Sequence, residues 1–442
     1  MNTPQRSSFP KALAAFTIAL AISVSAHAAT KTWNNAGTTW STGANWVGLA
    51  APTNDLTTDT ALFNSVSFGV TVPTTTAATS IAGITVGDGS TTTGPLTFTN
   101  TTSLTIGASG VTVAGNGSTG QVGQVNLGSN VILGASQTWT NNAYNSSNGT
   151  AALKVSGALT TAASLGPTTL TLAGSGTSGL FSTTAVNSYN IDLIGIIGQA
   201  SGTTLSLVVN TSGLGVVSLN AANTFSGGLT VKSGVVQLST ATSAGSGTIT
   251  LGDTGGSANA IIRGGSNTQT NAITVASGSS GALSIENTYN TNTIFSGAVS
   301  LNNNLTLVAS GAGGGSITMS GGFTGTGNLT LSTAGTGTQT SLNLTTNPVN
   351  MTGTITNGGS GLGATNISIG IGPNVTGVIQ NNANSKLTLS AANSYTGPTT
   401  VNLGTLQLNR ATSSLSSSSN LVMGGGTFVS DNTGGLPRSA SR

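Results

Sequence analysis

Residues 389–408 read LSAANSYTGPTTVNLGTLQL, and this segment carries more information about the fold than any other. It aligns without gaps with residues 219–238, LNAANTFSGGLTVKSGVVQL, which lie far earlier in the chain. In both copies apolar residues alternate with Thr, Ser or Asn, and Gly or Asn interrupts the alternation every few residues. A period of two with such interruptions is typical of short β-strands joined by sharp corners. Each copy therefore predicts a unit of strand, corner, strand, corner and strand.

The positions that agree between the copies are the candidate structural residues of the motif. In each copy an Asn is expected to begin a corner, an aromatic ring to cover the end of a coil, and two Gly residues to turn the chain, because Asn and Gly tolerate positive φ. These residues are Asn223, Phe225, Gly227 and Gly234 in the first copy, and Asn393, Tyr395, Gly397 and Gly404 in the second.

The same alternation extends over the chain beyond Thr30, where the sequence predicts no helix. A tetrad of apolar residue, any residue, apolar residue and Gly recurs, and its first three examples begin at Ile84, Leu104 and Val125. Short strands at a regular spacing, closed by Gly, favour a solenoid in which each coil pairs with the coils above and below. The prediction is an all-β fold, a parallel β-helix of about 17 to 20 coils with roughly 20 to 24 residues each.

The paired motif resembles the autotransporter-associated β-strand repeat, also called the passenger-associated transport repeat. The clear copies span 216–243 and 386–413. The opening of the chain is also similar to the start of such proteins, with Trp33, Trp40, Asn45, Trp46, Pro52, Asp55 and Phe63 in the matching order. The resemblance implies a right-handed parallel β-helix that is exported and displayed at, or released from, the bacterial surface, with an outer-membrane translocator as its partner.

The N-terminus has the features of a secretory signal peptide, assigned to residues 1–28. Arg6 and Lys11 precede the apolar segment 12–25, and Ala26-His27-Ala28 provides a small-x-small cleavage pattern. The apolar segment is shorter than the roughly 20 residues that a membrane span needs. We therefore expect a secreted or surface-exposed chain with no transmembrane span after cleavage.

The remaining boundaries follow from composition. Residues 29–70 are interpreted as a Trp-rich N-terminal cap, 71–430 as β-helix repeats, and 431–442 as an irregular tail. The segment that follows Leu408 reaches only to Arg442, which is too short for the strands of a translocator barrel. The sequence leaves open a truncated passenger, a fragment, or a soluble secreted relative.

Composition excludes several classes of site. The 442 residues contain 10 Lys and Arg, 7 Asp and Glu, and no Cys, and the single His lies in the predicted signal peptide. After cleavage there is no thiol or imidazole for a nucleophile, a general base or a zinc site. Charge is too sparse for nucleic-acid binding, which depends on clustered Lys and Arg. We predict no cofactor and no metal.

We interpret the chain as an exported, non-enzymatic β-helical passenger or surface protein whose repeats form a rigid stalk and aid secretion. The alternative is a secreted carbohydrate-active β-helix enzyme. Such an enzyme needs two or three converging carboxylates, and only Asp55 and Asp59 are close in sequence. The other acidic residues are Asp88, Asp192, Asp253, Glu286 and Asp431. Asp88, in Gly87-Asp88-Gly89, suggests a corner rather than a calcium site, because tandem carboxylates are missing.

Three of the four Trp residues, Trp33, Trp40 and Trp46, cluster near the start of the chain. Such rings can stack on sugars, which would suit a carbohydrate-binding adhesin. They can equally cap the end of the solenoid core, which solenoids require. A glycan site predicts that Trp40→Ala weakens glycan retention, whereas a cap predicts that it impairs folding.

Overall fold

A computed structural model describes residues 28–64, 73–87, 95–99, 102–115, 124–143, 153–175, 190–212, 215–311, 313–335, 337–338, 340–409 and 413–430. Residues 1–27 of the predicted signal peptide, the predicted tail 431–442, and Asp88 lie outside the described residues.

Almost all regular structure in the described ranges is β-strand. The single helical element there is a 3-10 turn, η1 (Gly43–Asn45). The strands of the N-terminal half are β1 (Ala29–Thr32), β2 (Asp59–Phe63), β3 (Thr79–Val86), β4 (Leu96–Phe98), β5 (Leu104–Val113), β6 (Val125–Leu127), β7 (Val131–Leu133), β8 (Gln137–Asn141), β9 (Leu153–Val155), β10 (Leu159–Thr161), β11 (Pro167–Gly174), β12 (Ile191–Leu193), β13 (Thr204–Thr211) and β14 (Val216–Leu219). Those of the C-terminal half are β15 (Leu229–Leu238), β16 (Ile249–Leu251), β17 (Ala260–Gly264), β18 (Thr268–Gln269), β19 (Ile273–Val275), β20 (Leu283–Asn287), β21 (Asn292–Phe295), β22 (Val299–Leu301), β23 (Leu305–Ala309), β24 (Ser316–Met319), β25 (Phe323–Gly325), β26 (Leu329–Thr333), β27 (Ser341–Leu344), β28 (Gly353–Gly359), β29 (Ala364–Ile367), β30 (Val375–Leu389), β31 (Thr399–Leu408), β32 (Leu421–Met423) and β33 (Thr427–Ser430).

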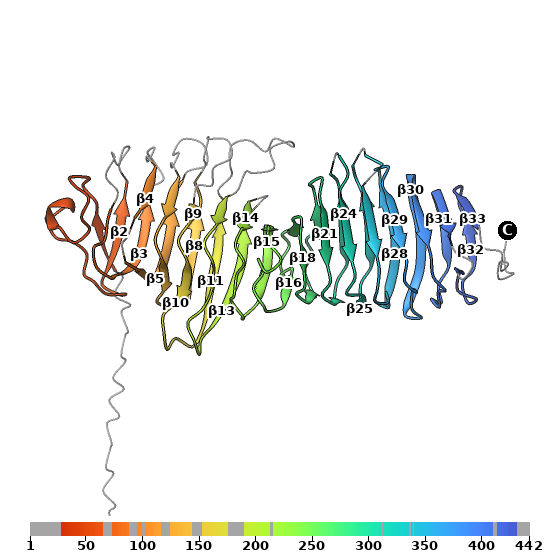
Figure 1. Ribbon diagram of the computed structural model, residues 1–442, viewed down its shortest axis with the longest axis horizontal. Helices are drawn as coiled ribbons and strands as arrows, with labels where there is room; N and C mark the ends of the chain where they lie inside the picture. The colour runs from red at the N-terminus through yellow and green to blue at the C-terminus, as the bar shows by residue number, and fades with distance from the viewer. Residues whose placement is uncertain are drawn as a thin grey trace, which may run out of the picture.

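These strands wind into a parallel β-solenoid, with the coils stacked along the long axis from the red N-terminal end to the blue C-terminal end (Figure 1). Pairing between coils is parallel, as where β15 pairs with β16 and β16 with β19. The prediction of an all-β parallel β-helix is confirmed. Because the backbone of each coil bonds to its neighbours, the fold is held together by continuous hydrogen-bond ladders.

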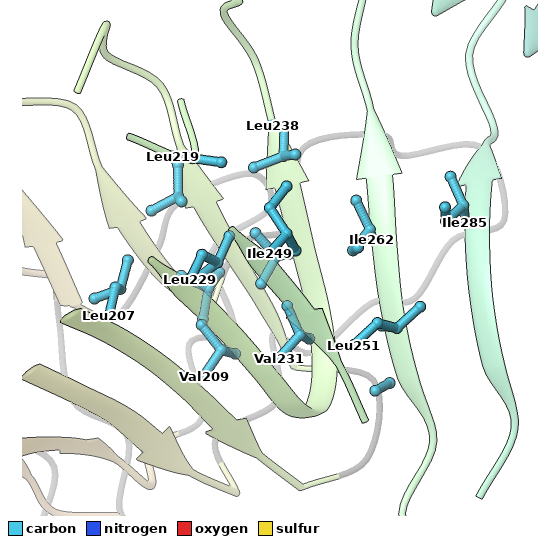
Figure 2. Close-up of a cluster of buried hydrophobic side chains, with 14 of the residues drawn as sticks. Leu207, Val209, Leu219, Leu229, Val231, Leu238, Ile249, Leu251, Ile262 and Ile285 are labelled. Carbon is cyan, nitrogen blue, oxygen red and sulfur yellow. The ribbon is translucent and has the colours of Figure 1, made fainter. Parts of the chain in front are cut away.

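The core is a set of side-chain columns inside this winding. Leu207 pairs in register with Leu229, which pairs with Ile249, so that similar aliphatic residues stack directly on one another. Val209 and Val231 begin a second column beside the first. Figure 2 shows these side chains pointing into the interior from successive coils. The alternation of apolar and Thr or Ser residues produces this arrangement, because every second side chain of a strand faces the same side.

The predicted coil number is wrong. The solenoid has about 13 turns rather than 17 to 20, because its coils are longer and more variable than the tetrad spacing indicated. Leu229 pairs with Ile249, whereas the step from Leu153 to its partner Ile191 is almost twice as long. The physical reason is that one coil contains more than one short strand, so that consecutive tetrads lie on different faces of the solenoid.

The first tetrads illustrate this error. Ile84 does not stack on Leu104 but pairs with Val111, one coil later, while Leu104 pairs with Val131. The interval between Ile84 and Leu104 therefore measures a path around part of the coil and not the coil itself.

Candidate functional site

The first repeat copy is organised around the side chain of Asn223, which is buried at a corner. Its Oδ1 accepts a hydrogen bond from the backbone N–H of Ile197 at 2.8 Å, and its Nδ2 donates to the backbone carbonyl of Ser243 at 2.7 Å. Ile197 belongs to the preceding coil and Ser243 to the following one. One amide therefore joins three consecutive coils, which only a side chain with both a donor and an acceptor can do.

The second copy repeats this bridge. Asn393 Oδ1 accepts from the N–H of Ile371 at 3.0 Å, and its Nδ2 donates to the carbonyls of Ala391 at 3.0 Å and Ser414 at 2.7 Å. Ile371 precedes and Ser414 follows by one coil. The structure thus gives the predicted corner residue a specific task, namely to satisfy main-chain groups that the strand ladder leaves unpaired at the corner.

The aromatic residue two positions later is fully buried in both copies, since Phe225 and Tyr395 are 0% exposed. The Tyr395 hydroxyl lies 2.6 Å from the hydroxyl of Thr399, which lies 2.8 Å from that of Ser419 in the next coil. Burial raises the pKa of the Tyr395 phenol, and its hydroxyl neighbours only partly offset this. In both copies the aromatic ring is part of the hydrophobic core.

The two Gly positions of the motif require glycine for different structural reasons. Gly234 and Gly404 have φ of +83° and +67°, in the region that favours glycine, and they bend a continuous strand from one face of the solenoid to the next. Gly227 and Gly397 are not in that region. They are needed because the preceding coil is close: a Cβ on Gly227 would lie 2.6 Å from the Leu205 carbonyl oxygen, and one on Gly397 would overlap that of Thr376.

The three clustered Trp side chains lie at the N-terminal end of the core, where Trp33, Trp40 and Trp46 are 2%, 4% and 0% exposed. Trp46 packs edge to face against Trp33 and Trp40, with ring centroids 5.0 and 5.1 Å apart, and all three contact Phe63. The Trp46 Nε1–H donates to the Trp40 carbonyl at 2.7 Å. Rings packed against one another in this way present no free face on which a sugar could stack, which favours the cap.

A small hollow of about 180 Å³ lies beside this cluster, lined in part by Trp40, Pro52 and Asn54. The Asn54 side chain is already engaged, because its Oδ1 accepts from the N–H of Ser80 at 2.6 Å. Trp40 itself is 4% exposed, so the hollow leaves little of its ring open to a ligand.

Asp55 and Asp59, the closest acidic pair in the sequence, have separate structural tasks. Asp55 closes a turn: the Thr58 hydroxyl and the N–H groups of Thr57 and Thr58 donate to its carboxylate and hold its pKa below the usual value. Asp59 is 3% exposed and accepts from the N–H of Thr53 at 2.7 Å. Neither arrangement is that of an acid and a base converging on a substrate.

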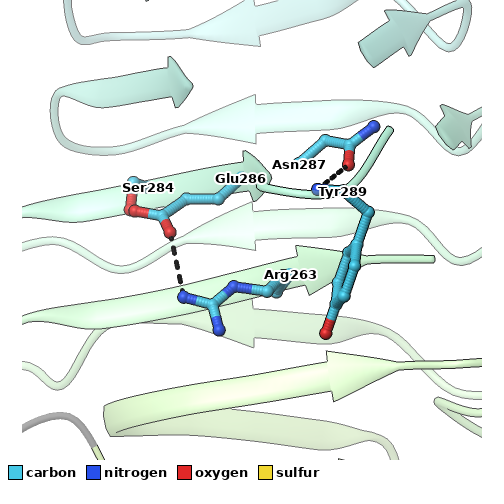
Figure 3. A network of polar contacts seen from close by, with 5 residues as sticks. All are labelled: Arg263, Ser284, Glu286, Asn287 and Tyr289. Atoms are coloured by element: carbon cyan, nitrogen blue, oxygen red, sulfur yellow. Dashed lines mark hydrogen bonds and ion pairs between the residues drawn. The ribbon is translucent and has the colours of Figure 1, made fainter. Parts of the chain in front are cut away.

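The acidic residues farther along the chain face cations on neighbouring coils. Arg263 and Glu286 pair in register, with Nη2 and Oε2 3.4 Å apart (Figure 3), and Ser284 donates to the other carboxylate oxygen. Lys232 and Asp253 form a more exposed pair at 3.2 Å. In each pair a cation on one coil neutralises a carboxylate on the next, so these carboxylates already have a partner.

The carboxylate of Asp192 also faces a cation on a neighbouring coil. Burial raises the pKa of its carboxyl, whereas Lys154, its register partner on the preceding coil, and a 2.6 Å hydrogen bond from Asn220 act in the opposite direction.

Within the described ranges there is no group of three or more His, Cys, Asp or Glu side chains that could hold a metal ion. The same ranges contain no helix long and apolar enough to cross a membrane.

Sequence reasoning missed a buried polar cluster next to the second copy. Asn357 donates to Gln380 at 2.6 Å and accepts from Thr365 at 2.7 Å, while Gln380 donates to the carbonyls of Asn382 and Ser385, both at 2.9 Å. Asn357, Thr365, Gln380 and Asn382 are 0% exposed. Only the run of polar residues inside an otherwise alternating strand, NNANS at 381–385, hints at this cluster.

Comparison with known proteins agrees with this geometry. A family model described as the passenger-associated-transport-repeat matches residues 211–238 and 384–408, the segments that contain the two Asn-centred corners and their following strands. No curated protein and no solved structure gives a significant match to the chain. The chain is thus a parallel β-solenoid that carries two copies of the passenger-associated transport repeat.

Proposed function

We propose that this protein is an exported, non-enzymatic β-helical passenger whose solenoid forms a rigid stalk at the cell surface or in the medium. In this proposal the two repeats aid secretion, and an outer-membrane translocator is the partner. The repeat match and the parallel solenoid support this assignment. The predicted signal peptide supplies the first export step.

The observation that carries the proposal is the Asn bridge across three coils. A chain that crosses a membrane unfolded must gain stability coil by coil, because each coil of a solenoid contacts only its neighbours. Asn223 and Asn393 each add side-chain hydrogen bonds to the coil before and the coil after. A coil that carries such a bridge holds its neighbours more firmly, which would oppose backsliding during export.

The test compares export of the epitope-tagged full chain in its native host with that of the double variant Asn223→Ala, Asn393→Ala. We expect the fraction at the surface or in the medium to fall severalfold. The matched control is Asn350→Ala, because Asn350 is also a corner residue but, among the described residues, its side chain bonds to one neighbouring coil, through the N–H of Asn374. Equal export of the double variant and the control would contradict the proposal.

The enzyme alternative has its own test. Purified protein is incubated with a panel of polysaccharides, and we expect no turnover, since the described carboxylates are engaged separately. Robust turnover that Asp55→Ala or Asp59→Ala abolishes would replace the structural assignment by a carbohydrate-active one.

A further inference from the structure

A hollow of about 470 Å³ lies on the outer side of the first repeat copy, away from the Trp cluster. It extends over three coils, since its lining comes from the segments 223–224, 242–248 and 270–272. A volume in this range is typical of ligand sites, which occupy about 300 to 1,000 Å³.

The lining of the hollow is neutral and rich in hydroxyl groups. Its exposed hydroxyl side chains are Thr224, Thr242, Ser246, Thr248 and Thr270. Among the described residues that line it there is no charged and no aromatic side chain. Such a surface disfavours ionic ligands, which need a counter-charge, and flat apolar ligands, which need a hydrophobic wall. It suits a neutral molecule with many hydroxyl groups of its own.

The floor of the hollow is held in place by the amides of Asn223 and Asn271. Asn271 is 7% exposed, and its Nδ2 donates to the carbonyls of Gly245 at 3.0 Å and Gly247 at 2.7 Å. Together with the Asn223 bridge to Ser243, these bonds fix the loop 242–248 between its two neighbouring coils. A surface ordered before binding loses less entropy when a ligand arrives.

The second floor amide has unused hydrogen-bonding capacity. The Oδ1 of Asn271 is buried and has no hydrogen-bond donor among the described residues. Buried polar atoms in folded proteins nearly always have a partner. The orientation of the amide follows from its two Nδ2 bonds, which leave this Oδ1 as a buried acceptor at the base of the hollow.

We propose that this hollow, over the corner of the first repeat, binds a neutral glycan. Hydroxyl groups of the sugar would pair with the Thr and Ser hydroxyls of the rim, and the three-coil length of the hollow suits consecutive sugar units. The site goes beyond the proposed role in export and is independent of it, because glycan binding can be measured on purified folded protein.

The experiment measures binding of neutral hexasaccharides (maltohexaose, cellohexaose, mannohexaose and chitohexaose) to the purified chain by calorimetry and saturation-transfer NMR. The rim variant Thr242→Leu, Thr270→Leu removes two hydroxyls and fills space, and both positions are exposed, so the fold should persist. The matched control is Thr324→Leu, an exposed threonine of β25 outside the hollow. We expect at least one probe to bind, and the rim variant to weaken its binding by about tenfold or more.

The proposal also predicts a salt-independent affinity, since no ionic contact contributes. The thermal unfolding midpoints of the rim variant and the control should match that of the unmodified chain. Failure of all four probes to bind would overturn the proposal. So would equal binding by the rim variant and the control, or a preference for acidic oligogalacturonate that salt abolishes.

Discussion

At the scale of single residues, the repeat depends on side chains whose hydrogen-bonding groups or small size no other residue type reproduces. Asn223 and Asn393 need a donor and an acceptor on one short side chain, and Ala at either position would leave main-chain groups of two neighbouring coils without partners. Position 397 accepts only glycine, because a Cβ there would overlap the carbonyl group of Thr376. Tyr395 differs from its counterpart Phe225 by one hydroxyl, which allows the contribution of that group to be measured.

Tyr395→Phe should lower the free energy of unfolding at neutral pH by about 1 kcal/mol, because the Thr399 hydroxyl loses one partner. The substitution should also remove the decrease in folding stability that ionisation of Tyr395 causes at alkaline pH. The pKa of Tyr395 is raised above its ordinary 10.0, so the unfolded chain releases this proton at a pH where the folded chain retains it. Stability is therefore full below the ordinary pKa and falls as pH rises toward the raised one.

Urea unfolding of the unmodified chain and of Tyr395→Phe between neutral pH and about pH 11 checks this sign. Tyr289→Phe is the control and should retain the alkaline slope. An unchanged slope in Tyr395→Phe would show that another group causes it.

Gly397→Ala should destabilise the chain by about 1 to 3 kcal/mol, the usual cost of inserting a methyl group where there is no space. The added Cβ would overlap the Thr376 carbonyl oxygen of the preceding coil. Gly166→Ala is the matched control, because a Cβ there meets no heavy atom within 4 Å. Chemical denaturation of both variants measures the difference, and equal effects would show that the coils separate easily at residue 397.

At the scale of elements, each coil is stabilised through the coil next to it and not through distant contacts. β15 makes this clear, because its first half pairs with β16 and its second half, beyond Gly234, pairs with β17. The first strand, β1, pairs only with β2 among the described strands. We therefore expect the Trp cluster to shield the core at the N-terminal end from water.

Trp46→Ala should destabilise the N-terminal coils by about 3 to 5 kcal/mol, since a fully buried large ring is removed. Because a solenoid is stabilised by nearest neighbours, the loss should remain local. Amide hydrogen exchange should accelerate in β1, β2 and β3 and remain slow in β26 to β31. The neighbouring Val47→Ala is the control, since Val47 is 60% exposed. Uniform acceleration over the whole chain would contradict nearest-neighbour stability.

At the scale of the whole molecule, the rod is stabilised by backbone pairing and aliphatic columns, with little electrostatic contribution. The sequence has 10 basic and 7 acidic residues in 442. The pair Lys232–Asp253 lies on the surface of adjacent coils, whereas Arg263–Glu286 is partly buried. Surface pairs of this kind typically contribute between 0 and about 1 kcal/mol each.

The free energy of unfolding should therefore change by less than about 1 kcal/mol when NaCl is raised from about 0.05 to 0.5 M, although salt screens charges strongly over this range. Urea titrations at the two concentrations measure the change. A large loss of stability in high salt would mean that ion pairs, rather than strand ladders, hold the coils together.

The alternation of apolar and hydroxyl residues was sufficient to predict strands, a parallel solenoid and an aliphatic core, because strand periodicity is a local property. The two copies also revealed the motif residues, since Asn223 and Asn393 occupy equivalent corners. Gly227 and Gly397 lie at bends of the chain, as predicted, but glycine is needed there for close approach of a carbonyl group and not for a positive φ. Close approach depends on the neighbouring coil, which a local pattern does not describe.

By itself, then, the sequence determined the class of fold and the places where the chain bends. Only the tertiary structure decided the coil number, the burial of Trp46, the pairing of Arg263 with Glu286, and the hollow over Asn223 and Asn271. The reason is that partners in a solenoid lie one coil apart, and here the length of a coil varies nearly twofold along the chain. Which side chains contact one another therefore depends on how the coils stack.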